Sequence, residues 1–293
     1  MSSAPRPEIS LVPTEGWHCT HLFYRFDRAR LRNLGPSEMS EGTREFVAAL
    51  DPAGPGAPTR LQTFVVSGQK ADFGVLLLGP DPLAIDAVHQ RLMSGHLGPA
   101  ITPSYSFVSM TEVSEYLPSV EQYGQRLAGE GLRPEEAEYG QKLQQYERRL
   151  EIMRKQRLTP DLPAWPAICF YPMNKKRAVG ENWFLLDFHE RERLMGEHGE
   201  SGMQFAGRVT QLVTVGIGLD DWEWGVTLWA RNPQFLKDIV YRMRFDEASA
   251  RYAEFGSFYV GYLRTATEIL EHCRIAGHSQ RGIVHPSQPG GGG

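Results

Sequence analysis

His198 is the first residue whose type and surroundings suggest chemistry. It lies late in a predicted amphipathic helix over residues 190–205, and the next residue, Gly199, leaves room for a flat ligand to approach. A lone histidine cannot hold a structural zinc ion, but it can be the single axial ligand of a heme iron, because the macrocycle supplies four nitrogens. Taken alone, each histidine is more simply explained as a surface residue or a satisfied core residue.

The other histidines give weaker signals for a metal site. His18 and His21 are three apart on a predicted strand, so their side chains point to opposite faces. His189 and His198 are nine apart, not the four that would place two ligands on one helix face, and the chain has no HExxH motif. The spacing therefore disfavours a zinc site built from several histidines.

A run of three cations follows the predicted strand over residues 167–171. The segment reads Phe-Tyr-Pro-Met-Asn-Lys-Lys-Arg over residues 170–177, so the strand meets Pro172 and then three basic residues. This is either a solvated basic turn or an edge that binds carboxylates or phosphates. Arg157 and Arg244 could add further positive charge to such an edge.

Composition and missing motifs exclude several classes of protein. The net charge of -4 argues against a broad nucleic-acid surface. No GxGxxG, P-loop or GxSxG motif is present, and Asp220-Asp221 is best explained as turn chemistry. The three cysteines are far apart, with no CxxC or CxxCH, which fits a reducing compartment and argues against covalent heme attachment. With no secretory signal and no apolar run long enough to span a bilayer, we expect a cytoplasmic protein.

The pattern of apolar runs, helical periodicities and turn residues predicts the same order of elements twice, β-α-β-β-α-β. Two such copies suggest an α+β chain of duplicated ferredoxin-like units, whose free sheet faces could pack together into a barrel-like core. We expect an N-terminal unit over residues 1–120, a helical connector over 121–164, a ligand-binding unit over 165–275 and a flexible tail over 276–293. The connector contains an amphipathic helix from Pro134 to Leu158 with a narrow apolar seam, which favours a surface position. The predicted elements are strands at 17–26, 61–66, 73–78, 104–113, 167–171, 208–215, 223–230 and 255–263, and helices at 40–50, 81–93, 134–158, 190–205, 233–243 and 246–254.

Several segments of the second half, in consistent spacing, resemble the coproheme decarboxylases, which are peroxide-dependent heme synthases of the chlorite-dismutase-like superfamily. The first half is similar more loosely, through residues 15–17, 68–70 and 106–116. The segments that carry the main resemblance are residues 169–177, 182–183, 191–199, 220–228, 243–249 and 255–261.

The resemblance implies a duplicated ferredoxin-like fold, a subunit of the dimeric α/β-barrel type and a homopentamer. It also implies a reaction in which two propionates of iron coproporphyrin III (coproheme) become vinyls to give heme b, with hydrogen peroxide as oxidant and the porphyrin as both substrate and redox centre. The ferrochelatase that supplies coproheme would be a transient partner.

The same resemblance assigns roles to individual residues. His198 matches the proximal iron ligand, and Tyr171 matches the tyrosine whose radical takes a hydrogen from a propionate. Lys175 matches a lysine beside a reacting propionate. The other matches are Arg157 and Ser249 as propionate contacts, Arg244 as a further candidate, Met173 and Trp183 as porphyrin-lining residues, and Gln211 at the distal position, where chlorite dismutases carry an arginine.

Other functions stay open on the sequence alone. A chlorite dismutase or peroxidase could share the fold, although the neutral Gln211 lacks the charge that would steer chlorite. A carrier or sensor of heme or coproheme would bind the porphyrin without turnover and would not need Tyr171 and Lys175 together. A ferredoxin-like oligomer without a cofactor would bind no porphyrin.

Overall fold

The computed structural model describes residues 9–275 of the 293-residue chain. The flexible tail predicted over residues 276–293 and most of the N-terminal tail lie outside the described residues. Within residues 9–275, no helix combines the length and the apolar character needed to cross a bilayer.

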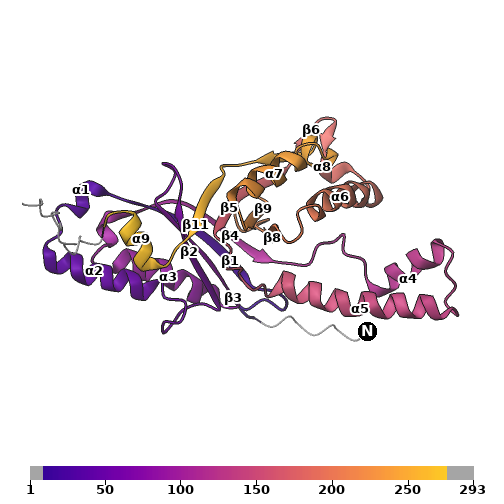
Figure 1. The fold of residues 1–293 in the computed structure, drawn as a ribbon, viewed down its shortest axis with the longest axis horizontal. Helices are drawn as coiled ribbons and strands as arrows, with labels where there is room; N and C mark the ends of the chain where they lie inside the picture. The colour runs from indigo at the N-terminus through magenta and orange to yellow at the C-terminus, as the bar shows by residue number, and fades with distance from the viewer. Residues whose placement is uncertain (1–8, 276–293) are drawn as a thin grey trace, which may run out of the picture.

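The predicted α+β architecture is confirmed. The N-terminal unit has the predicted order of strands and helices, and its central strand β3 is buried along its whole length, as its continuous apolar sequence requires. Helices α2, α3 and α9 lie together on one side of the sheet (Figure 1). The elements of this unit are β1 (His18–Phe26), α1 (Arg28–Leu31), α2 (Pro36–Ala49), β2 (Arg60–Val66), β3 (Phe73–Gly79), α3 (Pro82–Ser94), η1 (Gly98–Ala100) and β4 (Ile101–Thr111).

The C-terminal half repeats the pattern after two connector helices, α4 (Val120–Gly129) and α5 (Ala137–Leu158). Helices α6, α7 and α8 gather at the far side of the molecule from α2 and α3 (Figure 1). The remaining elements are β5 (Ala167–Lys175), β6 (Arg177–Ala178), β7 (Glu181–Asn182), η2 (Trp183–Leu185), α6 (Phe188–Met203), β8 (Val209–Val215), β9 (Trp224–Ala230), α7 (Pro233–Met243), α8 (Glu247–Ala250), β10 (Ala253–Phe255), β11 (Tyr259–Leu263) and α9 (Ala266–His272).

One antiparallel sheet joins the two units. Its order is β10-β5-β11-β2-β3-β1-β4-β8-β9, and β9 also pairs with β5, so eight strands close into a ring of pairings. The junctions between the units are β11 with β2, where Gly261 faces Val66, and β4 with β8, where Met110 faces Val215. The units are therefore two halves of one continuous sheet.

The faces of the two units that are free of helices pack together, as predicted. Each strand of the ring contributes buried residues to one largely aromatic cluster. Phe23 stacks on Tyr259 with ring centroids 4.1 Å apart, and Phe170 stacks on His21 at the same distance. Burial of this apolar surface is the main force that holds the halves together.

Several predicted boundaries were wrong, among them that of β4, which begins at Ile101 and not at Ser104. Helix α2 begins at Pro36, not at Ser40, because Gly35 is the N-cap and its backbone N–H donates to the side chain of Glu38. Strand β5 continues through Pro172 to Lys175. Residues 246–254 are not one helix, because α8 ends at Ala250 and residues 253–255 form strand β10, which pairs with the edge of β5.

The short helix α1 was not predicted, and neither were two longer helices, α4 in the connector and α9 near the end of the described chain. Both begin with a capping box, Ser119 with Gln122 and Thr265 with Glu268, so a local signal was present. Helix α9 packs with α2 in the core of the N-terminal unit, so the chain returns to its first half at its end. The expected division into domains stays a prediction.

Candidate functional site

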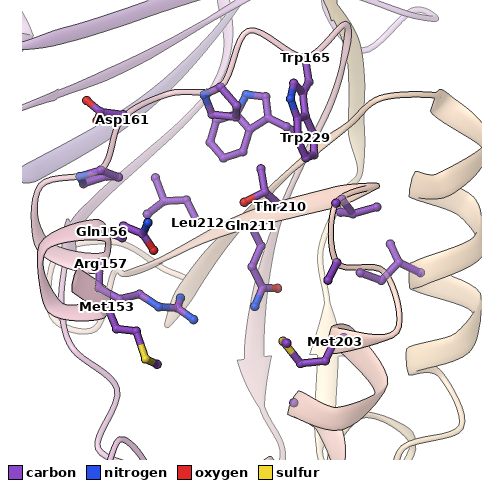
Figure 2. A pocket seen from close by; sticks show the side chains of 18 of the residues that line it. Met153, Gln156, Arg157, Asp161, Trp165, Met203, Thr210, Gln211, Leu212 and Trp229 are labelled. Atoms are coloured by element: carbon purple, nitrogen blue, oxygen red, sulfur yellow. The ribbon is translucent and has the colours of Figure 1, made fainter. Parts of the chain in front are cut away.

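A large cavity lies between the C-terminal end of α5, helix α6 and strand β8. Its volume is about 1050 Å³, which suits a ligand of substantial size. Figure 2 shows Gln211 extending from β8 into the space between Arg157 and Met203, with Trp165 and Trp229 together at the other end of the cavity. Helix α5 was expected to be a surface connector, but its last two turns form one wall of this cavity.

His198 lines the cavity from α6, and its side chain is 28% exposed. Its Nδ1 atom lies 3.1 Å from Oδ2 of Asp246 and 3.4 Å from Oγ of Ser249. Both contacts use Nδ1, which leaves Nε2 for a ligand. Burial lowers the pKa of His198, and the positive charge of Lys175 acts in the same direction, while Asp246 opposes them. A neutral imidazole of this kind is ready to coordinate a metal.

Asp246 holds the histidine in place. It is 1% exposed, and its Oδ1 accepts a hydrogen bond of 2.6 Å from Ser201 while Oδ2 faces His198. Arg242 adds an ion pair, with its Nη1 3.5 Å from Oδ1. A buried carboxylate on the second nitrogen of a histidine fixes the orientation of the ring and its tautomer, which is the usual support for a metal-bound histidine.

Lys175 ends strand β5 and is buried, at 8% exposure, rather than lying in a solvated turn. Its Nζ lies 3.9 Å from the centroid of the Trp183 ring and donates to the carbonyl oxygen of Ala248 at 3.2 Å. Burial lowers the pKa of Lys175 to about 8, although the charge of Glu223 acts against this shift. In the described part of the chain, no carboxylate lies within 4.0 Å of this amine.

Arg157 is a second cation in the same situation. It lines the cavity from the last turn of α5, and burial lowers the pKa of its guanidinium. Between residues 9 and 275, no acidic side chain forms an ion pair with it. Because a desolvated cation is costly unless it is paired, Arg157 and Lys175 together indicate an anionic ligand.

Tyr171 lies on the same face of β5 as Met173 and Lys175, since side chains alternate along a strand. Its ring stacks on Phe258, with centroids 4.4 Å apart, and meets Phe255 edge-on at 5.8 Å. Burial raises the pKa of the phenol, so Tyr171 is protonated. Tyr171 does not line the cavity. It belongs to a buried cluster with residues of β8 and α7, and some members of that cluster, such as Ile239 and Met243, do line the cavity.

The remaining predicted residues fall into two groups. Gln211 lines the cavity, and Ser249 lies beside His198. Arg244 stacks over Phe255 at 4.3 Å and reaches Tyr171 only through its charge. Trp183 lies beneath Lys175, outside the cavity lining, and Met173 packs partly buried at the edge of the Tyr171 cluster.

Sequence reasoning missed several contributors to the site. Asp246 stands within a segment that carried the resemblance, but no local pattern shows that it faces His198, 48 residues earlier in the chain. The cavity-lining residues Met153, Trp165, Met243 and Trp229 read as ordinary core or seam positions and gave no separate signal. Only the folded chain brings these elements together.

The described residues contain no group of three or more His, Cys, Asp or Glu side chains placed to hold a metal ion. Of the other histidines considered, His21 is fully buried, and its Nε2 lies 2.7 Å from Oγ1 of Thr227. A metal held at His198 would therefore bring most of its own ligands, as an iron porphyrin does.

This chain is similar to known proteins over most of its length, both in sequence and in structure. Over 255 residues, the chain is 37% identical to the coproheme decarboxylase of Staphylococcus carnosus (strain TM300), covering 85% of this chain and 92% of that protein. Among solved structures, a heme-binding protein from Thermus thermophilus is similar with a TM-score of 0.70 and 35% identity, covering 88% of this chain and 95% of the other.

A chlorite dismutase variant from Candidatus Nitrospira defluvii shares the fold at a TM-score of 0.66 and 17% identity, covering 89% of this chain and 96% of that one. The family model for chlorite dismutase matches residues 38–264, which include His198 and every strand of the large sheet except β1. This chain therefore belongs to the chlorite dismutase family.

Proposed function

We propose that this protein converts iron coproporphyrin III to heme b by oxidative decarboxylation of two propionates, with hydrogen peroxide as the oxidant. The observation that carries the proposal is a cavity lined by the oriented His198 and the desolvated Arg157, together with a second desolvated cation, Lys175, that lies outside the cavity lining. Within residues 9–275, neither cation has a carboxylate within 4.0 Å. A porphyrin with four carboxylates supplies the missing anions, and its iron supplies the partner for the histidine. The likeness to the Staphylococcus carnosus enzyme supports the same assignment.

His198 would bind the iron through Nε2. The donor set fits, because Nδ1 is already engaged by Asp246 and because two of the α6 residues that line the cavity, at positions 199 and 202, are glycines without a side chain. A macrocycle could therefore lie close to the helix. The iron porphyrin then supplies the redox chemistry, while the protein supplies orientation and charge.

Arg157 and Lys175 would bind propionates through charge-assisted hydrogen bonds. Ser249, beside His198, offers a hydroxyl for the same purpose, and Arg244 offers a more exposed cation next to the Tyr171 cluster. These residues come from α5, β5 and the α7–α8 segment. Arg157 lines the cavity and Ser249 lies beside His198, so they could meet carboxylates on different edges of one flat molecule. Met173 and Trp183 would border the porphyrin on the β5 side.

Tyr171 would act as the radical relay. Its phenol is protonated and desolvated and has aromatic neighbours on two sides, so loss of an electron must be accompanied by loss of its proton. Replacing each propionate with a vinyl releases carbon dioxide, two electrons and one proton. One molecule of hydrogen peroxide accepts those two electrons with two protons and gives two molecules of water, so the full reaction consumes two peroxides.

Gln211 would meet the oxidant within the cavity that it lines together with His198. Its amide can donate and accept hydrogen bonds but carries no charge. A chlorite dismutase would gain from a cation here to attract its anionic substrate. The glutamine therefore favours a neutral oxidant such as hydrogen peroxide.

The test is to load the purified protein with iron coproporphyrin III, add hydrogen peroxide stepwise and follow the product by mass. We expect two losses of carbon dioxide with two hydrogens each, and we expect Tyr171→Phe to bind the porphyrin but leave its mass unchanged. Tyr262→Phe is the matched control, because Tyr262 borders the same cluster from β11. Tight binding without a mass change in the wild type would refute the enzyme and leave a carrier or sensor.

We further propose that the protein works as a homopentamer in the cytoplasm and receives coproheme through transient contact with a ferrochelatase. The likeness to a coproheme decarboxylase and the scattered free cysteines support these expectations. Light scattering of the purified protein would test the size of the assembly.

A further inference from the structure

Glu223 is a buried carboxylate close to the site, and the reaction outlined above gives it no part. The residue is 7% exposed and stands just before strand β9. Its Oε2 accepts a 2.8 Å hydrogen bond from the backbone N–H of Lys175, and its own N–H donates to Oδ1 of Asn174 at 2.8 Å. These two reciprocal bonds fasten the end of β5 to the start of β9, at the point where Lys175 leaves the strand.

Arg177 meets the same carboxylate from the solvent side. Its guanidinium pairs with Oε1 of Glu223, and its side chain, 59% exposed, also lies over the ring of Phe184 at 4.7 Å. The two oxygens of Glu223 are thus divided between the backbone of Lys175 and the guanidinium of Arg177. Arg177 thus partly neutralises the carboxylate on its solvent side. The remaining negative charge favours the protonated form of the Lys175 amine.

The ammonium group of Lys175 has few charged neighbours. The charge of Glu223, the residue before β9, acts on it, and so does His198 of α6, which is paired with Asp246. Its direct contacts are neutral, namely the Trp183 ring and the carbonyl of Ala248. Glu223 is therefore the anion that counters the desolvation of this amine.

We infer that Glu223, balanced by Arg177, is a positioning residue that fixes the backbone of Lys175 and sets the positive charge on its amine. The inference deepens the proposed function, in which that amine meets a propionate of the substrate. An amine held by a full negative charge would be protonated but less free to attract a carboxylate, and one without any counter-charge would lose its proton at a lower pH. Because Arg177 offsets part of the charge of Glu223, the negative charge that acts on the Lys175 amine is intermediate between these two cases.

The two partners make opposite predictions. Glu223→Gln keeps an oxygen to accept from the backbone of Lys175 but removes the charge that favours the ammonium, so the amine should titrate at lower pH than in the wild type. Arg177→Gln leaves the carboxylate uncompensated, so the amine should titrate at higher pH. Asn174→Ala loosens the same strand end without changing any charge, and serves as the structural control.

The first measurement is the NMR titration of lysine side chains in the protein without porphyrin, with the Lys175 signal assigned by its loss in Lys175→Met. The wild-type midpoint is expected near pH 8. We expect a downward shift in Glu223→Gln, an upward shift in Arg177→Gln and an unchanged midpoint in Asn174→Ala. Shifts of the two charge variants in the same direction, or no shift in either, would overturn the inference.

The second measurement is the affinity for iron coproporphyrin III across pH 6 to 10. Each unit by which the Lys175 midpoint moves should change the affinity about tenfold on the basic side of the profile. The NMR midpoints could move as expected while the affinity for iron coproporphyrin III stays the same from pH 6 to 10 in every variant. In that case the inference about Glu223 stands and the assignment of Lys175 to a propionate fails. The two ideas can thus fail separately.

Discussion

The Nδ1 atom of His198 and the Oδ2 atom of Asp246 lie 3.1 Å apart, and this contact joins helix α6 to the segment that precedes α8. The carboxylate is buried, and its second oxygen is bound by Ser201. The ring of His198 therefore has one orientation before any ligand arrives.

Replacing Asp246 with Asn should weaken iron porphyrin binding. The amide can still accept from Nδ1 but no longer makes the imidazole more basic, and support of this kind is worth about 10–100-fold in metal affinity. The measurement is an absorbance titration of the purified protein with iron coproporphyrin III. Ser201→Ala, which removes a second hydrogen-bond partner of Asp246, should have a smaller effect. Equal affinity in Asp246→Asn and wild type would show that the contact does not support the ligand.

Replacing Lys175 with Met should stabilise the protein without porphyrin and weaken its binding of porphyrin. The folded pKa of about 8 lies below the ordinary value of 10.5, so burying the ammonium costs stability below pH 8, and that cost is relieved as pH rises from 8 to 10.5. Removing the amine should gain about 1–3 kcal/mol at pH 7. Denaturant unfolding at pH 7 and pH 10 checks this, and a Met variant that is less stable at pH 7 would contradict it.

Gly199 and Gly196 form a natural pair for testing where the porphyrin lies. Both are exposed positions within α6, and a Cβ at either would meet nothing within 4 Å, so Ala at each should stabilise the helix by about 0.5–1 kcal/mol. Of the two, only Gly199 borders the cavity. We expect Gly199→Leu to reduce porphyrin affinity at least tenfold and Gly196→Leu to leave it unchanged; equal effects at both would place the porphyrin elsewhere.

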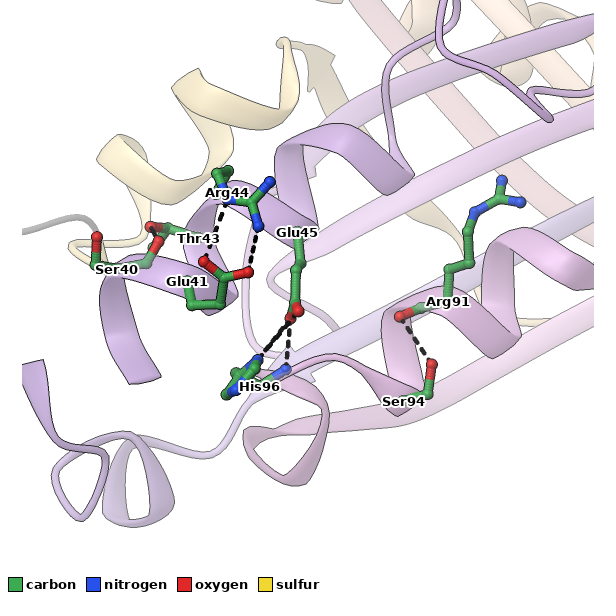
Figure 3. A network of polar contacts seen from close by, with 8 residues as sticks. All are labelled: Ser40, Glu41, Thr43, Arg44, Glu45, Arg91, Ser94 and His96. Atoms are coloured by element: carbon green, nitrogen blue, oxygen red, sulfur yellow. Dashed lines mark hydrogen bonds and ion pairs between the residues drawn. The ribbon is translucent and has the colours of Figure 1, made fainter. Parts of the chain in front are cut away.

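The surface pair of Glu45 and His96 should make stability depend weakly on pH. Figure 3 shows Glu45 of α2 contacting both the ring and the backbone N–H of His96, at 3.0 and 2.8 Å. Hydrogen bonding raises the pKa of His96 and lowers that of Glu45. The contribution of His96 is complete below its unfolded pKa near 6.5 and is lost as pH rises, whereas that of Glu45 is lost as pH falls below about 4.5.

His96→Ala should therefore lower the Tm more at pH 5.5 than at pH 9. The effect should be small, because both groups are exposed to solvent and the interaction is screened. Thermal unfolding of the variant and the wild type at both pH values measures it. A larger loss at pH 9 would mean that the ion pair does not carry the effect.

Much of the fold could be predicted because its strands and helices have clear periodicity. The run over residues 73–78 was recognised as a strand and is buried throughout, and the helix opened by Asp81-Pro82 begins where its cap predicts. The errors have local causes. Pro172 does not end β5, because the strand continues in pairings with β9 and β10. Residues 253–255 form a strand because they pair with β5, although their sequence pattern favours a helix.

The site was less predictable from the residues themselves. His198 was a single weak signal, and the basic run predicted three similar cations, of which Lys175 is buried while Arg177 lies at the surface. A strand end that turns inward cannot be distinguished from a solvated turn by composition. Asp246 contacts His198, and Glu223 contacts Lys175. The two residues of each pair are 48 positions apart in sequence and meet only in the folded chain.

The position of β11 bears on how the molecule unfolds. This strand lies between β5 of the C-terminal half and β2 of the N-terminal half, and helix α9 then anchors the chain in the N-terminal core. Neither half has a complete sheet of its own, so the two should melt in one cooperative transition rather than in succession. A cavity-forming substitution far from His198, in the core beneath α2 and α9, would then lower the amount of folded protein in the cell. The molecules that remain folded would have unchanged activity.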